Sequence, residues 1–145
     1  MRPIRPDDPE LLDFLRAADL TLPVASARIR IWVERDESGQ IVGSTGFETA
    51  DDPTHALIRS VAVLTSSRGQ GNGLRLATFA LNAARAAGSR RAWLFSRRSG
   101  PFWQRLGFAP ADRAETAELL ASTQQVSLFR ESRQLEREVA WARDL

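Results

Sequence analysis

The length of 145 residues predicts a single domain over residues 1–145 with its own hydrophobic core. The formal net charge of +2 gives no reason to expect nucleic-acid binding, and no apolar run is long enough to cross a membrane or form a secretion signal, so a cytoplasmic protein is expected. The chain has no cysteine, which excludes disulfides and cysteine nucleophiles. It has one histidine, His55, and a single histidine argues against a metal site or a Ser-His-Asp triad.

The first predicted elements are a short strand and a helix. Residues 1–4 are typical of a strand. In the segment 7–20, Asp8 is placed to cap a helix N-terminus, and Pro9 lies in the first turn, where its missing N–H costs nothing. The apolar residues that follow share one helical face, so this helix is predicted to be amphipathic.

Three strands are predicted next. Apolar and polar residues alternate over 28–34, which is typical of a strand with one wet face. The turn sequence DESGQ separates it from a second strand over 40–49, so the two are predicted to form a hairpin. The segment DDPT then interrupts the pattern before a third strand over 55–64.

The longest predicted helix follows a glycine-rich loop and ends near Gly88, a typical C-terminal cap. Its polar residues form one narrow stripe, and they are Arg75, Thr78, Asn82 and Arg85. Because the other side chains are mostly apolar, this helix is predicted to be well buried against a sheet.

The remaining third of the chain predicts three elements and an ambiguous tail. A strand is predicted over 90–96, a short helix over 100–108 and another helix over 114–123. The tail, 135–145, fits a strand and a helix equally well. Four arginines within 89–99 are interpreted as a solvated edge.

The loop before the long helix contains three glycines, Gly69, Gly71 and Gly73, behind Arg68. A helix N-terminus presents unpaired N–H groups and partial positive charge, and glycine lets an anion approach the backbone closely. The loop is therefore interpreted as a phosphate cradle. A tight structural turn is the alternative interpretation.

Two common nucleotide-binding loops do not fit. A P-loop ends in lysine before serine or threonine, and this chain has no lysine. A dinucleotide-binding loop needs Gly-x-Gly-x-x-Gly with an acidic residue at the end of the next strand, whereas these glycines are evenly spaced and the strand over 90–96 ends without an acid.

The loop resembles the acyl-CoA loop of the Gcn5-related N-acetyltransferase superfamily, Arg/Gln-x-x-Gly-x-Gly/Ala, matched here by Arg68, Gly71 and Gly73. The preceding IRSVAV is similar to the central strand of that family, and PFWQRLGF is similar to its late aromatic and Gly-Phe signature. The resemblance covers roughly residues 29–108.

The resemblance implies an α/β (α+β) fold whose mixed, mostly antiparallel central sheet is splayed at an acetyl-CoA site and flanked by helices. It implies acetyl-CoA as co-substrate and no metal. By position in the family motif, the residues expected to line the acetyl and pantetheine arm are Val61, Ala62 and Val63, those around the pyrophosphate are Arg68, Gly69, Gln70, Gly71, Asn72, Gly73 and Leu74, and those along the rest of the arm are Ser96 and Phe102.

Within the superfamily, the segments GFE, LIRSVAV, FWQRLGF and DRAE resemble the arsenic-resistance-associated acetyltransferase branch. This implies an N-acetyltransferase whose partner is a small, amino-acid-like amine, with no nucleic acid or membrane involved. Two alternatives stay open, acetylation of peptide or protein N-termini and a CoA-binding sensor without catalysis. A homodimer is compatible with the resemblance.

Acetyl transfer requires a polarised thioester, a neutral amine and a proton for the leaving thiolate. The backbone N–H of Val63 is the candidate oxyanion donor, and Glu48 is the candidate base, with an exposed strand-end glutamate as the alternative. Relatives place a tyrosine acid where this chain has Trp103, whose indole is no usable acid. Ser60 or Ser96 could relay the proton instead, or the thiolate leaves unassisted or through water.

Arg59, in the predicted central strand, is the candidate for acceptor binding, because a guanidinium pairs well with a carboxylate or a phosphonate. Strand alternation places it on the same face as Leu57, Val61 and Val63. A salt bridge to an internal acid is the alternative explanation for an arginine there.

Overall fold

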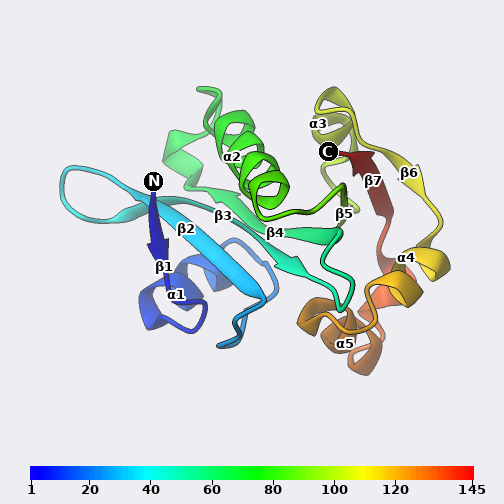
Figure 1. Cartoon of the computed structure of the whole chain (residues 1–145). Coiled ribbons are helices and arrows are strands. Elements are labelled where there is room, and N and C mark those ends of the chain that lie inside the picture. The colour runs from blue at the N-terminus through cyan, green and yellow to red at the C-terminus, as the bar shows by residue number, and fades with distance from the viewer. The chain divides into compact units, whose positions relative to one another are not determined.

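The computed structural model describes all 145 residues, which form two compact units. The first contains residues 1–48 and 58–83, and the second contains residues 49–57 and 84–145. Figure 1 shows the elements of both units in chain order. No helix has the length and apolar character needed to cross a membrane.

The chain contains seven strands, five α-helices and two short 3-10 helices. In order they are β1 (Arg2–Ile4), α1 (Pro9–Ala17), β2 (Ile29–Arg35), β3 (Ile41–Thr49), β4 (His55–Val63), η1 (Thr65–Ser67), α2 (Asn72–Ala86), β5 (Arg91–Phe95), α3 (Gly100–Arg105), β6 (Ala109–Ala111), α4 (Arg113–Leu119), α5 (Gln124–Glu131), η2 (Gln134–Arg137) and β7 (Ala140–Asp144).

The strands form a mixed sheet in the order β1-β2-β3-β4-β5-β7-β6. β4 and β5 pair in parallel, with Leu57 opposite Trp93, whereas β1 with β2, β2 with β3, β5 with β7 and β6 with β7 are antiparallel. A parallel pair requires a long crossover, which α2 supplies between β4 and β5. This confirms the expected mixed sheet flanked by helices.

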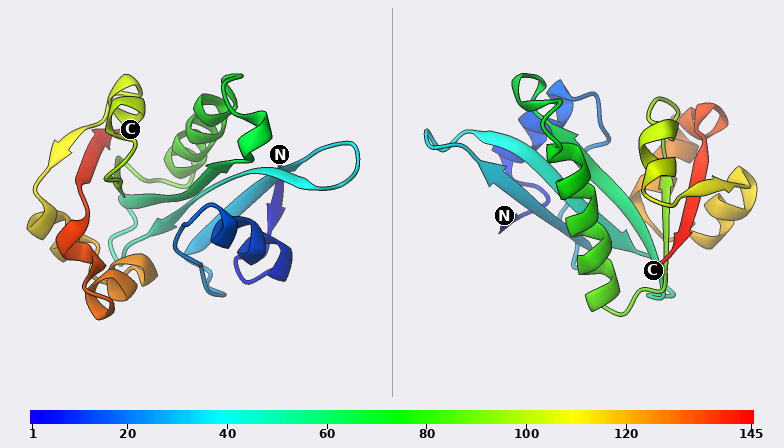
Figure 2. Two further views of the ribbon diagram at one scale, coloured as in Figure 1. Left: turned by 180° about the vertical axis from the view of Figure 1, so that it is seen from behind. Right: turned by 90° about the horizontal axis from the view of Figure 1, so that it is seen from above.

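In the first unit, alternate side chains of β2 pack against two different helices, α1 and α2. Ile31 and Val33 are buried in a cluster with Leu11 and Leu15 of α1. The intervening Trp32 packs edge-on to Phe79 of α2, with 5.2 Å between ring centroids. The two helices therefore lie on opposite faces of these strands, as Figure 2 shows.

The predicted β2–β3 hairpin and the predicted Asp8 helix cap are confirmed in this unit. Asp8 accepts hydrogen bonds from the N–H groups of Glu10 and Leu11. Between β2 and β3, Asp36 accepts hydrogen bonds from the Ser38 hydroxyl at 2.6 Å and the Gln40 N–H at 3.0 Å. These bonds hold the pKa of Asp36 below its usual value.

The second unit is built around β5. Trp93 packs with Leu57, Leu120, Val126 and Ala142, which brings α4, α5 and β7 onto one apolar cluster with the start of β4. The Trp93 indole N–H also donates to Nδ1 of His55 at 3.1 Å. The one histidine is therefore a partly buried structural residue of this unit.

The C-terminal third departs most from the sequence-based expectation. The helix predicted over 114–123 ends at Leu119, and α5 and β6 were not predicted. The Thr123 side chain accepts from the Val126 N–H and so begins a new helix after the break. The tail, which fitted helix and strand equally, contains η2 followed by β7, because residues 140–144 pair with both β5 and β6.

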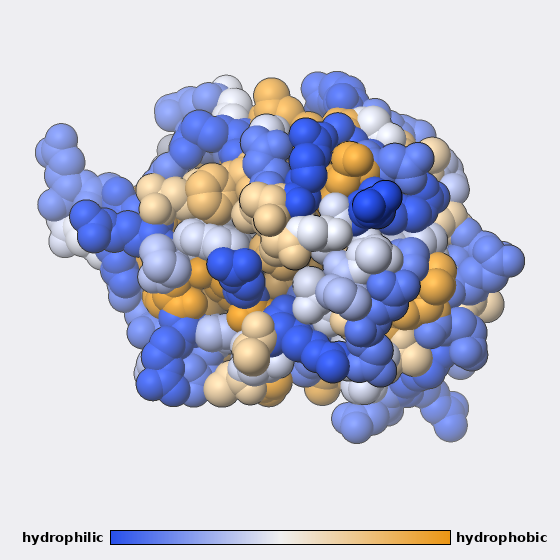
Figure 3. All heavy atoms as spheres, in the orientation of Figure 1, coloured by the Kyte–Doolittle hydropathy of each residue, from blue (hydrophilic) through white to orange (hydrophobic).

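Few large apolar side chains are exposed, and most of them lie outside the helices and strands. They are Met1, Leu20, Val24, Leu74, Leu119 and Val139. On the face drawn in Figure 3, hydrophilic side chains predominate and the apolar ones form small, separate patches.

We predict that Gly46→Ala destabilises the first unit far more than Gly43→Ala does. A Cβ at Gly46 would lie 2.4 Å from the carbonyl oxygen of Arg30, a backbone atom of the paired strand, whereas a Cβ at Gly43 would first meet the flexible end of Leu76 at 2.9 Å. We expect Gly46→Ala to reduce the free energy of unfolding by about 3 kcal/mol and Gly43→Ala by about 1 kcal/mol, measured by urea titration. Equal losses would contradict this account of the β2–β3 contact.

Candidate active site

The loop that leads from β4 to α2 contains two glycines in a backbone conformation that other residues rarely adopt. Gly69 and Gly71 have φ angles of +82° and +75°, in the left-handed region. A Cβ at either position would have nothing within 4 Å, so the backbone conformation, not crowding inside the protein, requires glycine there. α2 begins at Asn72, so Gly73 lies in its first turn.

The N–H groups of residues 69–74 donate no hydrogen bond within the protein. The first intramolecular bond beyond them is from the Arg75 N–H to the Gly71 carbonyl at 3.1 Å. The same six residues are exposed or only partly buried. The loop and helix N-terminus thus present a run of donors to solvent, the arrangement that binds phosphate groups.

Side chains hold this loop in place from three points. The Asn72 amide donates to the Ser67 carbonyl at 2.9 Å, and Arg75 donates to Asn72 Oδ1 at 3.0 Å. Arg75 also forms a two-bond ion pair with Glu34 of β2, and its hydrogen bond holds the pKa of Glu34 below its usual value. The beginning of α2 is therefore tied to the strand beside it.

β4 is kinked at Ser60, the one residue of the strand in the left-handed region, with φ +62°. The Ser44 hydroxyl donates to the Ser60 carbonyl at 2.6 Å, and the Thr45 hydroxyl donates to the Leu76 carbonyl at 2.7 Å. Both hydroxyl donors are fully buried. Adjacent residues of β3 therefore fix both the kink of β4 and the helix that follows the loop.

The Ser60 side chain is unusual in a second respect. Its residue is 6% exposed, and its hydroxyl oxygen is buried with no hydrogen-bond partner. A buried hydroxyl without a partner costs about 1–3 kcal/mol, and left-handed backbone at a residue with a Cβ costs about 1–2 kcal/mol more. Strain and an unsatisfied group in one residue are typical of functional positions.

The two candidate charged residues of this unit are paired with each other. Arg59 Nη1 donates to Glu48 Oε2 at 2.8 Å, and their side chains are 0% and 3% exposed. Burial lowers the pKa of Arg59, and the neighbouring Glu48 carboxylate opposes that shift. The internal salt bridge considered for Arg59 is confirmed, and the alternative of an exposed Glu48 is wrong.

The structure brings one group of predicted residues together in the first unit. It contains Glu48, Arg59, Ser60, Val61, Ala62, Val63 and the loop residues Arg68 to Leu74. Arg68 Nε donates to the Val63 carbonyl at 3.3 Å, which links the loop to the end of β4. The kink at Ser60 interrupts the expected alternation, since Leu57 and Arg59 are buried whereas Val61 and Val63 are partly exposed.

The other two predicted residues, Ser96 and Phe102, belong to the second unit. The Ser96 N–H donates to the Val139 carbonyl at 2.9 Å, and the Ser96 hydroxyl oxygen accepts from the Ser99 N–H. Phe102 packs edge-on to Trp103.

Trp103, at the position of the tyrosine expected by resemblance, is a buried core residue. It is 7% exposed, and its ring also packs against Phe108 at 5.4 Å between centroids. Its indole therefore serves the aromatic core of the second unit.

Sequence analysis missed a further polar cluster in the second unit, around Glu138. This carboxylate is 6% exposed, accepts from Gln134 and lies close to Arg97. It falls in the tail that fitted helix and strand equally, so no periodicity marked it as buried. Two of the four arginines within 89–99, which were interpreted as a solvated edge, are thus in ion pairs: Arg97 with Glu138, and Arg91 with Asp144.

Comparison with protein families matches the acetyltransferase (GNAT) family over residues 4–108. Comparison with curated proteins gave no match.

Three solved structures share the fold. N-acetylglutamate synthase from Neisseria gonorrhoeae, complexed with coenzyme A and N-acetyl-glutamate, is 17% identical with a TM-score of 0.72, and the match covers 99% of this chain but 34% of that one. Rv2747 from Mycobacterium tuberculosis, in complex with CoA, is 17% identical with a TM-score of 0.71, covering 100% of this chain and 99% of that one. An acetyltransferase of GNAT family from Staphylococcus aureus is 12% identical with a TM-score of 0.70, covering 99% and 98%. The likeness establishes the fold of this chain.

We predict that breaking the buried pair costs more than removing both partners. Arg59→Met leaves the Glu48 carboxylate buried without the guanidinium and should lower the free energy of unfolding by about 3–5 kcal/mol. Arg59→Met combined with Glu48→Leu should recover most of that loss. Arg16→Met, which removes an exposed pair with Asp13, should change the free energy of unfolding by about 0.5 kcal/mol or less. Chemical denaturation measures all three, and a double variant less stable than Arg59→Met would contradict the prediction.

We further predict that Ser60→Gly stabilises the protein. Glycine accepts the left-handed conformation and removes the unsatisfied hydroxyl, so the free energy of unfolding should rise by about 1–2 kcal/mol. Ser60→Ala keeps the backbone strain and should give a smaller gain. If thermal unfolding shows Ser60→Gly to be less stable than wild type, the backbone of Ser60 is not strained and the prediction is wrong.

Proposed function

We propose that this chain, which belongs to the acetyltransferase (GNAT) family, transfers an acetyl group from acetyl-CoA to the amine of a small, amino-acid-like acceptor. The observation that carries the proposal is the run of N–H groups in residues 69–74 that bind nothing within the protein. The neighbour complexed with N-acetyl-glutamate and coenzyme A supports an amino-acid-like acceptor and this co-substrate.

In this proposal the loop residues Arg68 to Leu74 bind the pyrophosphate of acetyl-CoA. Val61, Ala62 and Val63, beyond the kink of β4, bind the acetyl and pantetheine arm through their backbone groups. Because Gly69 and Gly71 carry no side chain over their amides, an anion can reach the backbone directly.

The amine nitrogen of the acceptor attacks the thioester carbonyl carbon, and the carbon–sulfur bond breaks as CoA leaves as a thiolate. The Val63 N–H stabilises the negative charge on the carbonyl oxygen. Holding amine and thioester in attack geometry supplies up to about 7–11 kcal/mol of the barrier reduction.

Two proton transfers complete the reaction. Glu48 takes the proton lost by the amine, directly or through water. Its close pairing with Arg59 supports a positioning role for Arg59 in place of direct contact with the acceptor.

The thiolate gains the other proton, and Ser60 is the proposed relay. The Ser96 hydroxyl oxygen already accepts a hydrogen bond in its own loop, whereas the Ser60 hydroxyl has no partner. This difference favours Ser60 of the two serines.

A second candidate function, CoA binding without catalysis, is favoured by one observation. The position where the resemblance expects a tyrosine acid holds Trp103, packed into the aromatic core. A transferase releases CoA thiol only when an acceptor amine is present, whereas a sensor binds acetyl-CoA and releases none. Thiol detection with a panel of amino acids, phosphinothricin and short peptides separates the two and identifies the acceptor class.

We predict that Gly71→Trp abolishes acetyl-CoA binding, because the indole would occupy the place of the pyrophosphate. Gly39→Trp is the matched control, since Gly39 also has positive φ, at +88°, and open space, but lies in the β2–β3 turn. Calorimetric titration should show wild-type affinity for Gly39→Trp and an affinity at least about tenfold weaker for Gly71→Trp. Equal affinities in the two variants would count against the loop as the pyrophosphate site.

A further inference from the structure

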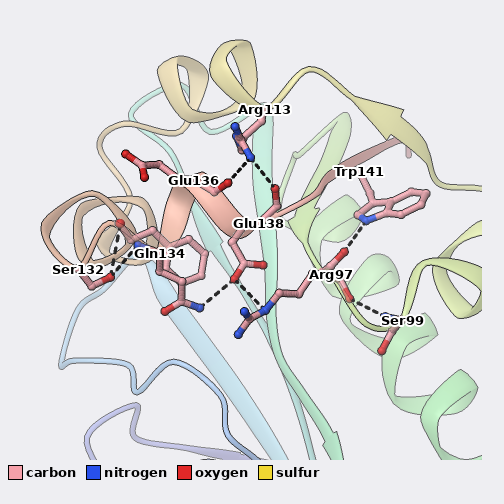
Figure 4. Close-up of polar contacts among 10 residues, drawn as sticks. Arg97, Ser99, Arg113, Ser132, Gln134, Glu136, Glu138 and Trp141 are labelled. Carbon is pink, nitrogen blue, oxygen red and sulfur yellow. Dashed lines mark hydrogen bonds and ion pairs between the residues drawn. The ribbon is translucent and has the colours of Figure 1, made fainter.

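Glu138 places a buried negative charge just before β7. Its residue is 6% exposed, and Gln134 Nε2 donates to its Oε2 at 2.8 Å. Arg97 Nε lies 3.8 Å from the same oxygen, beyond hydrogen-bond distance. Figure 4 shows Gln134 and Arg97 approaching the Glu138 carboxylate from different sides.

Both charged groups keep atoms available for a ligand. The second oxygen, Oε1, of Glu138 accepts no hydrogen bond in the protein and is not closed off from solvent. Arg97 has a side chain that is 37% exposed, and its Nη1 and Nη2 make no hydrogen bond. The pair therefore satisfies only part of the bonding capacity of each member.

The backbone around Glu138 is held firmly. Arg113 Nη1 donates to the carbonyl of Glu136 at 2.6 Å and to that of Glu138 at 3.3 Å, as Figure 4 shows. The Glu138 N–H donates to the Leu135 carbonyl at 3.1 Å. Just before Gln134, Arg133 has left-handed backbone, with φ +61°. A strained segment held by several bonds presents a carboxylate that is ordered before any ligand arrives.

This pair adjoins Ser96. The carbonyl of Val139, next to Glu138, accepts from the Ser96 N–H, and the Trp141 indole donates to the Ser96 carbonyl at 2.9 Å. Arg97 directly follows Ser96 in the chain. The Arg97–Glu138 pair therefore lies where the end of β5 meets the start of β7.

A carboxylate and a guanidinium side by side, each with open bonding positions, match the two ends of an amino acid. An amine donates to a carboxylate oxygen, and a guanidinium donates two parallel hydrogen bonds to a carboxylate. We propose that Glu138 and Arg97 form an amino-acid subsite in the second unit, in which Glu138 Oε1 accepts from the amine of the amino acid and Arg97 Nη1 and Nη2 bind its carboxylate. This inference rests on the proposed function and selects, within it, acceptors that carry both groups.

The test is a binding measurement on the full chain. Wild-type protein is titrated with the standard amino acids and phosphinothricin, and the tightest of these is compared with its α-amide, which lacks the carboxylate, and with its deaminated acid, which lacks the amine. We expect the complete amino acid to bind on the order of tenfold more tightly than either analogue. No binding by any amino acid would overturn the proposal.

Two variants assign the preference to the pair. In Arg97→Met, the affinity for the complete amino acid should fall to the affinity that wild type has for the α-amide. In Glu138→Gln, which keeps the side-chain size, it should fall to the affinity that wild type has for the deaminated acid. Arg91→Met is the matched control, because Arg91 is an arginine of the same unit that pairs with Asp144 and stacks on Trp93. Preferences unchanged in Arg97→Met and Glu138→Gln, with circular dichroism spectra like wild type, would overturn the subsite.

A parallel acetyl-CoA titration separates this inference from the proposed function. Acetyl-CoA binding without any preference for complete amino acids contradicts the subsite alone. An amino-acid preference that depends on Arg97 and Glu138, without acetyl-CoA binding, supports the subsite and contradicts the proposed transferase.

Discussion

The left-handed backbone at Ser60 is the constraint on which the site of the first unit depends. Neighbouring residues of β3 enforce the geometry around it, since the Ser44 hydroxyl holds the Ser60 carbonyl and the Thr45 hydroxyl holds the Leu76 carbonyl in α2. The kinked strand and the helix after the loop are thus fixed by two buried hydrogen bonds from one strand. β3 therefore acts together with the Arg75–Glu34 pair from β2 to give the proposed cradle a defined position.

Local sequence patterns predicted most of the first unit correctly. The Asp8 cap, the β2–β3 hairpin and the helix that starts in the glycine loop all rest on interactions between residues close in sequence. Gly88 has the expected positive φ after α2. Such features are encoded within a few residues, and a single sequence is enough to reveal them.

Interactions between distant segments could not be predicted in this way. LIRSVAV has the pattern of a regular strand, and nothing in it marks Ser60 as kinked, because the bond that fixes its carbonyl comes from β3. The pairing of Arg59 with Glu48, and of Arg97 with Glu138, likewise depends on tertiary contacts. The tail shows its strand only through pairing with β5 and β6, so the burial of Glu138 before it left no periodic signal.

The most direct test of the account is an amide nuclear magnetic resonance titration of the isotope-labelled chain with acetyl-CoA. If acetyl-CoA binds at the kinked strand and the glycine loop, the amide signals of Val61 to Val63 and of Gly69 to Leu74 shift together and saturate at one concentration, while the Gly39 signal stays in place. Shifts confined to other parts of the chain, or none at all, would show that acetyl-CoA does not bind at the kinked strand and glycine loop.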